Sequence, residues 1–146
     1  MAPLIVQIVS TLLARAFVPW RDAARIGLAV MFLFTAGSHA SSLKYDMAAM
    51  IPPPLTGALW VIYVTGLLEA AGAGGLFTWR WRRAAAWCLI ALLVAMFPAN
   101  VYAALSGVTL GGSAATPLWL RTPLQIFWVA LLWWSTLARH SRSRAG

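Results

Sequence analysis

The stretch LTGALWVIYVTGLLEAAGAGGLF, residues 55–77, decides the fold. It is almost wholly apolar and long enough to cross a lipid bilayer, which takes roughly 20 residues of helix. Glu69 lies near its middle and is one of only three acidic residues in the chain. A carboxyl group at the centre of a membrane is costly unless it is protonated, paired or facing a polar cavity. We therefore expect Glu69 to mark a functional site, with a buried structural role as the alternative.

The rest of the chain has a similar composition. Charged residues make up 10% of it, whereas soluble domains carry about 25%. The net charge is +8, but the basic residues stand at the ends of apolar runs rather than in a polar patch, which argues against nucleic-acid binding. Cys88 is the only cysteine, so the chain has no dithiol redox centre, and we expect this side chain to be buried packing.

The apolar runs predict an all-α, polytopic membrane protein, in which a four-transmembrane-helix bundle forms a single domain over residues 1–146. The predicted spans cover residues 23–40, 56–79, 84–105 and 117–138. Asp22 and Thr56 are expected to cap the first two helices. Residues 1–22 are expected to form a leader, in which 4–17 is either an interfacial helix or loosely ordered. This length leaves no room for a soluble catalytic domain.

The arginines set the predicted orientation. A four-span bundle gathers nine of them on one side and leaves only Lys44 and Arg121 on the other. The positive-inside rule then places both termini in the cytoplasm. The nine are Arg15, Arg21, Arg25, Arg80, Arg82, Arg83, Arg139, Arg142 and Arg144.

Two longer connections fall on the opposite, outer side. Residues 41–55 contain Asp46 and three consecutive prolines, and this segment is either a surface loop or a re-entrant cap. We expect Asp46 to be a solvated loop residue. Residues 106–116 are rich in glycine and serine, which is typical of a flexible connection.

Polar side chains from all four spans lie at related depths toward the outer half. Such side chains avoid lipid, so they are expected to turn into the bundle and line a polar pocket that opens outward. Apolar side chains would close this pocket toward the cytoplasm. The candidate ligand-binding residues are His39, Glu69, Asn100, Arg121 and Gln125.

Each candidate also has a structural alternative. His39 ends a span and would serve there as an interfacial residue or a C-terminal cap. Arg121 would snorkel to lipid headgroups, and Asn100 would hydrogen-bond between helices. Residues 122–125, Thr-Pro-Leu-Gln, match a capping box with proline at the first helical position, which would occupy the Gln125 side chain.

Two helices carry further features. Gly66, Ala70 and Gly74 follow the small-xxx-small spacing, which predicts a close-packing face. In the third span, Pro98 cannot donate a hydrogen bond to the carbonyl of Val94, so we expect a kink and a free acceptor there. Small residues around Glu69 leave space for a partner side chain, a water or a ligand.

Several short motifs together resemble the DoxX-type membrane proteins, over about residues 27–134. The resemblance implies a four-helix protein of the bacterial inner membrane. It also implies a redox link, because the family is named after a subunit of a thiosulfate:quinone oxidoreductase. The motifs are Gly37-Ser38-His39, Met50-Ile51-Pro52-Pro53, Gly66-Leu67-Leu68-Glu69, Phe97-Pro98-Ala99-Asn100-Val101-Tyr102, and Arg121 with Pro123-Leu124-Gln125.

The chain supplies no intrinsic cofactor site that we recognise, and we expect no metal. His39 and His140 fall on opposite sides of the predicted bundle, so they cannot ligate one haem together. A redox role would therefore need a bound quinone or an oxidoreductase partner subunit.

Three functions follow as hypotheses. The leading one is a membrane component that binds a small hydrophobic or quinone-like ligand, with Glu69 and His39 exchanging protons and with Arg121 and Asn100 orienting a carbonyl or anion. The second is a non-catalytic membrane anchor or assembly subunit of an oxidoreductase. The third is a small transporter or an isomerase-like enzyme for a lipid-soluble substrate. The expected partners are the lipid bilayer and either an oxidoreductase subunit or further copies of the chain.

Overall fold

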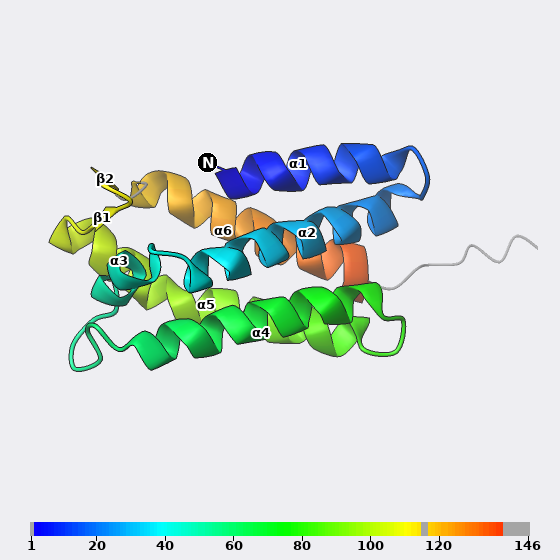
Figure 1. The fold of residues 1–146 in the computed structure, drawn as a ribbon. Helices are drawn as coiled ribbons and strands as arrows, with labels where there is room; N and C mark the ends of the chain where they lie inside the picture. The colour runs from blue at the N-terminus through cyan, green and yellow to red at the C-terminus, as the bar shows by residue number, and fades with distance from the viewer. Residues whose placement is uncertain (1, 115–116, 139–146) are drawn as a thin grey trace, which may run out of the picture.

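The computed structural model describes residues 2–114 and 117–138, and this part of the chain is almost entirely helical (Figure 1). One short hairpin pairs β1 (Thr109–Leu110) with β2 (Ser113–Ala114). A π-helical turn, η1 (Trp133–Leu137), continues the last helix. The helices are α1 (Ala2–Arg15), α2 (Trp20–Ala40), α3 (Lys44–Ala49), α4 (Leu59–Phe77), α5 (Arg82–Ser106) and α6 (Leu118–Leu132).

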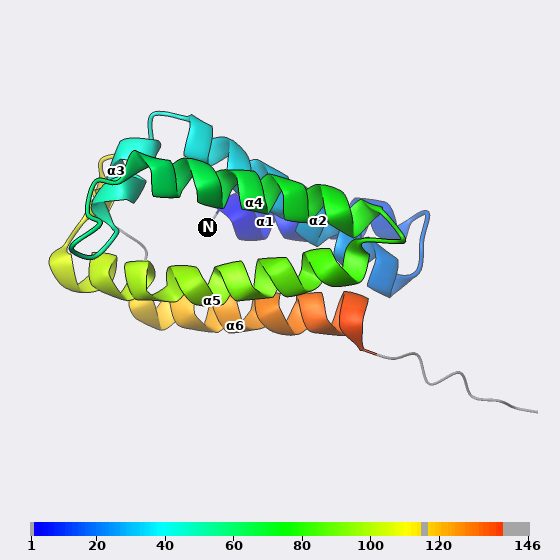
Figure 2. The ribbon, with the colours of Figure 1, turned by 90° about the horizontal axis from the view of Figure 1, so that it is seen from below.

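Three of these helices, α2, α4 and α5, are long and apolar enough to cross a membrane, which suggests a multi-pass membrane protein. Each lies within a few residues of a predicted span, and α4 is the stretch that carries Glu69. Helix α6 and η1 run beside α5 and cover the fourth predicted span (Figures 1 and 2). Chain neighbours among α2, α4, α5 and α6 run antiparallel, so alternate connections share an end of the bundle.

One end of the bundle is strongly cationic. It holds the α1–α2 connection with Arg15, the α4–α5 turn with Arg80, and the end of η1 (Figure 1). Arg21 donates hydrogen bonds to the carbonyls of Trp134 and Ala138 and so joins the start of α2 to the end of η1. We call this the cationic end. The predicted cations Arg139, Arg142 and Arg144, and also His140, lie outside the described residues.

The hydrophobic core lies near the cationic end. Leu28, Leu76, Leu89 and Leu132 bring together α2, α4, α5 and α6, and all are almost fully buried. Helices α4 and α5 approach closely there, because a Cβ atom at Gly72 would lie 2.6 Å from the Leu89 side chain. This packed layer separates the cationic end from the other half of the bundle.

The predicted close-packing face of α4 is wrong at one of its three residues. Gly74 is exposed, and a Cβ atom there would meet nothing within 4 Å. The close approaches fall instead at Gly66, which faces α2, and at Gly72 and Gly75, which face α5. Helix α4 packs against two neighbours, so its glycines serve two faces rather than one.

Both predicted helix caps are wrong. Helix α2 begins at Trp20, so Asp22 stands inside its first turn and pairs with Arg25 at 2.6 Å. Helix α4 begins at Leu59, and the Thr56 hydroxyl donates to the carbonyl of Ile51 at 2.9 Å instead of capping the helix. Cys88 was also expected to be buried, but it is exposed on the surface of α5.

Helix α1 folds back along α2 and packs against it (Figure 1). The contact is close at Gly27, where an added Cβ atom would lie 2.0 Å from Thr11 Oγ1 and 2.8 Å from the carbonyl oxygen of Gln7. The side chain of Gln7 is buried in this part of the fold. The segment is thus helical and docked on α2, while its predicted place at a membrane surface stays a prediction.

This contact predicts opposite effects for two glycines of α2. Gly27→Ala should destabilise the protein by about 1–3 kcal/mol, because the new methyl group has no room. Gly37→Ala should be neutral or stabilising by up to about 1 kcal/mol, because alanine favours helix and a Cβ atom there meets nothing within 4 Å. Thermal unfolding of both variants in the same detergent measures the difference. Equal midpoints would contradict the docked position of α1.

At the end opposite the arginines, α3 and the β1–β2 hairpin fold together. The backbone N–H of Gly111 donates to Asp46 Oδ2 at 2.8 Å. Gly111 and Gly112 have φ values of +60° and +76°, which suit the tight turn of a two-residue hairpin. The predicted flexible connection therefore forms a hairpin over 109–114. Asp46, expected to be a solvated loop residue, lies in α3 and connects this helix to the hairpin. Lys44 Nζ donates to Tyr63 Oη at 3.0 Å, and this bond raises the pKa of Lys44.

Candidate functional site

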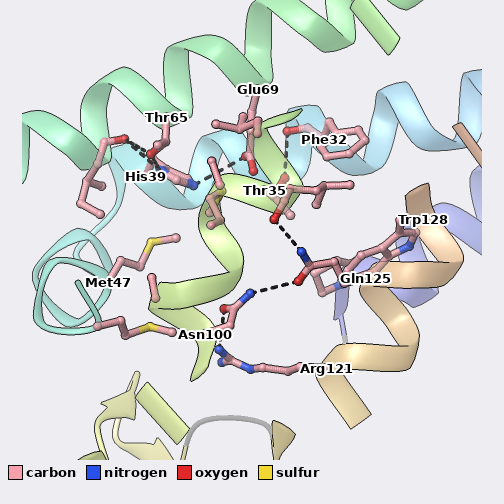
Figure 3. A pocket seen from close by; sticks show the side chains of 18 of the residues that line it. Phe32, Thr35, His39, Met47, Thr65, Glu69, Asn100, Arg121, Gln125 and Trp128 are labelled. Atoms are coloured by element: carbon pink, nitrogen blue, oxygen red, sulfur yellow. Dashed lines mark hydrogen bonds and ion pairs between the residues drawn. The ribbon is translucent and has the colours of Figure 1, made fainter. Parts of the chain in front are cut away.

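A cavity of about 610 Å³ lies in the half of the bundle away from the cationic end. Ligand pockets commonly have volumes of about 300–1,000 Å³, so this cavity has the size of a binding site. Helices α2, α4, α5 and α6 form its walls, and α3 with the residues after it lines one end (Figure 3). All five predicted site residues line it, namely His39, Glu69, Asn100, Arg121 and Gln125.

The α2 and α4 side of the cavity is built around His39, which is 3% exposed. Gly66 of α4 makes room for it, because a Cβ atom at Gly66 would lie 2.6 Å from His39 Cβ. The ring atom Nδ1 lies 2.9 Å from the carbonyl oxygen of Ile62. A carbonyl can only accept, so Nδ1 carries the proton and donates. His39 is therefore a fixed part of the wall and not an interfacial residue.

This hydrogen bond determines what the other ring nitrogen can do. With the proton on Nδ1, Nε2 of a neutral His39 is an acceptor that faces the cavity. Glu69 Oε2 lies 3.6 Å from Nε2 (Figure 3). Glu69 is 5% exposed, and its Oε2 atom is buried without a hydrogen-bond partner. The two groups face each other at a distance longer than a hydrogen bond, and they form an ion pair only when His39 is protonated. We call Glu69 and His39 the carboxyl wall.

The α5 and α6 side carries a chain of hydrogen bonds (Figure 3). Arg121 Nη1 donates to Asn100 Oδ1 at 2.9 Å, and Asn100 Nδ2 donates to Gln125 Oε1 at 3.4 Å. Gln125 Nε2 donates in turn to the carbonyl of Leu93 at 2.5 Å. Arginine has no acceptor and a carbonyl has no donor, so both amides can be oriented in only one way. We call Arg121, Asn100 and Gln125 the donor wall.

The donor wall decides between several sequence-based alternatives. The capping box at residues 122–125 is wrong, because α6 already begins at Leu118 and Gln125 bonds to α5. Asn100 does join two helices, as its structural alternative proposed. Arg121 lines the cavity and bonds inward to Asn100. Near Pro98, Gln125 donates to the carbonyl of Leu93. This residue directly precedes Val94, whose carbonyl was expected to be a free acceptor.

The two walls face each other across the cavity without a direct bond (Figure 3). Among the described residues, Arg121 makes no ion pair and no hydrogen bond with Glu69. The surface between the walls is mostly apolar and includes Phe32 and Leu92. Among the described residues, no group of three or more histidines, cysteines or acids is placed to hold a metal ion.

Sequence reasoning missed several lining residues. Thr35 stands one helical turn before His39, and this spacing was the available signal. Trp128 stands three residues after Gln125, and its Nε1 atom is buried without a partner. Four of the five methionines line the cavity without any periodic pattern, and so do two residues from the start of α1. These are Met31, Met47, Met50, Met96, Pro3 and Leu4.

A comparison with protein families places this architecture in a known group. The sequence model of one family, described as Domain of unknown function (DUF8561), matches residues 28–136. The chain belongs to the DUF8561 family. Both walls of the cavity lie within the matched DUF8561 region, while α1 lies outside it. No curated protein and no solved structure matches the chain.

Proposed function

We propose that this chain is a DoxX-type membrane protein with four spans that binds a small hydrophobic or quinone-like ligand in the cavity between the carboxyl wall and the donor wall. The observation that carries the proposal is the cavity itself, since it joins apolar surface with a few convergent polar groups. Buried Glu69 supports it, because its Oε2 atom has no hydrogen-bond partner in the described part of the chain and only the more distant contact with His39. Such groups are usually satisfied, so a ligand is the expected partner.

The proposed chemistry divides between the two walls. In this proposal His39 and Glu69 are the groups that exchange protons with a hydroxyl or carbonyl group of the ligand. The donor wall orients a carbonyl or anion through hydrogen bonds from Arg121 and Asn100. A quinone fits this division, because its carbonyl oxygens accept hydrogen bonds and take up protons on reduction. A redox-associated role would then connect the chain to an oxidoreductase partner.

The proposed orientation puts the cationic end in the cytoplasm of a bacterium and the cavity toward the outer half of the inner membrane. In this arrangement α2, α4, α5 and the continuous α6–η1 segment are the four spans. In this proposal the end of α1 at Arg15 is cytoplasmic and its start is not, because α1 folds back on α2 (Figure 1). This departs from the expectation that both termini are cytoplasmic. The C-terminal end of η1 lies at the same end as Arg15.

A cavity-filling variant tests the proposal. Ala99 lines the cavity, so Ala99→Trp should displace the ligand whatever its chemistry, while Ala104→Trp on the exposed surface of the same helix should not. Mass spectrometry of lipid extracts from the purified proteins should find a discrete molecule that the wild type and Ala104→Trp retain and Ala99→Trp loses at least tenfold. Glu69→Gln should reduce its amount without removing the cavity.

The proposal is contradicted if the lipid extracts of the wild type and of Ala99→Trp have the same composition. A wild type that carries only bulk phospholipid, in the same amounts as Ala99→Trp, would contradict ligand binding. The second proposal, a non-catalytic anchor or assembly subunit, would then take its place. Crosslinking in native membranes would test that role through capture of a specific oxidoreductase.

A further inference from the structure

We infer that the ligand of this cavity is an anionic amphiphile, with a carboxylate or phosphate head held at Arg121 and an apolar body in the rest of the cavity. This inference rests on the proposed ligand-binding function. Of the two groups that the donor wall could orient, a carbonyl or an anion, it chooses the anion and sets the quinone aside. It uses three observations: the donor inventory of one wall, the lack of an ion pair between Arg121 and any of the three acidic side chains, and the size and lining of the cavity.

Most of the hydrogen-bonding capacity left on the donor wall is donor capacity. The oxygen atoms of Asn100 and Gln125 accept hydrogen bonds from within the wall. Each amide nitrogen uses one N–H there and keeps a second, and the guanidinium of Arg121 uses one of its five donors. About six N–H donors remain unused, against one lone pair on each of the two amide oxygens, so the wall fits a group with several acceptor oxygens. Carboxylates and phosphates match an arginine fork in this way.

The charge of Arg121 is not balanced by the chain's own side-chain carboxylates. The chain has three acidic residues, and all three lie in the described part. Asp22 pairs with Arg25, Asp46 accepts from the Gly111 backbone, and Glu69 faces His39. Arg121 is partly buried, and a partly buried guanidinium is disfavoured without a counter-charge. An anionic head supplies that charge, whereas a neutral carbonyl leaves it uncompensated.

The cavity is much larger than an inorganic ion and mostly apolar. It has a volume of about 610 Å³ and is lined by residues such as Phe32, Met47 and Leu124. An ion alone would leave this apolar surface in contact with water. A ligand that carries an alkyl or prenyl chain would cover it, and burial of each CH₂ group is favourable by about 0.8 kcal/mol. The two properties together define an amphiphile.

Matched probes separate charge from hydrophobicity. The full-length chain is placed in nanodiscs of phosphatidylcholine, without anionic lipid, and binding is measured for dodecanoate, dodecyl phosphate, dodecanol and decylubiquinone. Ala99→Trp gives the background from partition into lipid. We expect at least one of the two anions to bind at least tenfold more tightly than dodecanol and decylubiquinone. The ratio between dodecanoate and dodecyl phosphate identifies the head group.

Two variants test the role of Arg121. Arg121→Gln should remove the preference for the anion, and Arg121→Lys should keep most of it. Asn100→Asp is nearly isosteric and places a carboxylate beside the guanidinium. It should lower the preference for the anion over dodecanol at least tenfold. The elution profile and melting temperature of the protein should stay unchanged. This second variant decides the matter if Arg121→Gln fails to fold.

The possible failures are distinct. If dodecanol or decylubiquinone binds above background as tightly as the anions, or if Asn100→Asp keeps the preference, the inference is overturned while the cavity keeps its function. If no probe binds above the Ala99→Trp background, both the inference and the proposed function fall.

Discussion

Gly66→Ala should lower the stability of the protein by about 1–3 kcal/mol and displace His39 from its place in the carboxyl wall. The new methyl group would lie 2.6 Å from His39 Cβ and 3.0 Å from its Cγ. Cβ is the base of the side chain, so rotation of the ring cannot relieve the clash. Helices α2 and α4 must separate, and the hydrogen bond from His39 to the carbonyl of Ile62 should weaken with them.

The matched control is Gly74→Ala on the same helix. A Cβ atom at Gly74 meets nothing within 4 Å, so this variant gains the helix preference of alanine, up to about 1 kcal/mol, without a clash. Unfolding in a denaturing detergent measures both stabilities, and the imidazole nitrogen signals of a histidine-labelled sample report the state of His39. If Gly66→Ala is as stable as Gly74→Ala in this unfolding experiment and leaves the imidazole signals unchanged, the close contact at Gly66 is wrong.

Gln125→Leu should cost about 2–5 kcal/mol, because it breaks the donor wall in the middle. The carbonyl of Leu93 and the amide nitrogen of Asn100 both lose their partner on this residue. A buried polar group without a partner costs about 1–3 kcal/mol, and the Asn100 amide nitrogen, which loses a longer bond of 3.4 Å, should cost about 1–2 kcal/mol. Arg121 should then lose its fixed position as well, since it is held through Asn100. Ligand binding should weaken together with stability.

Ile126→Leu provides the comparison, because residue 126 is exposed on the same helix and its change removes no polar group. It should change stability by less than about 0.5 kcal/mol. Both variants are compared in the same unfolding titration and the same ligand extraction. A Gln125→Leu protein that is as stable as Ile126→Leu would show that the hydrogen bonds of the donor wall add nothing to stability.

Much of the fold follows from local physics. Long apolar runs predicted helices α2, α4 and α5, because a helix satisfies its own backbone groups wherever water is excluded. The arginines of the chain termini and turns predicted that one end would be cationic, and Arg21, Arg25, Arg82 and Arg83 do lie close enough to interact. Helix α1 was predicted only as an interfacial or loosely ordered leader. Its docking on α2 includes a close contact at Gly27, whose partners Gln7 and Thr11 lie in the other helix.

The helix ends were less predictable than the helices. Asp22 and Thr56 are good capping residues, yet each bonds elsewhere in the folded chain. The side chain of Gln125 fits a capping box locally, and its partners on α5 become visible only when α5 and α6 lie side by side. Local preference and tertiary contacts compete for the same polar atoms, and the tertiary contacts decide the outcome.

The sequence by itself determined the class of protein and the residue types of the candidate site. Apolar length and sparse acids single out Glu69, and the cost of buried polar groups turns all five candidates inward. Only the tertiary structure decided their arrangement into two walls, His39 with Glu69 and Arg121 with Asn100 and Gln125. Depth along a helix can be counted from the sequence. Rotation of one helix against another depends on close contacts such as Gly66 with His39, which no single helix contains.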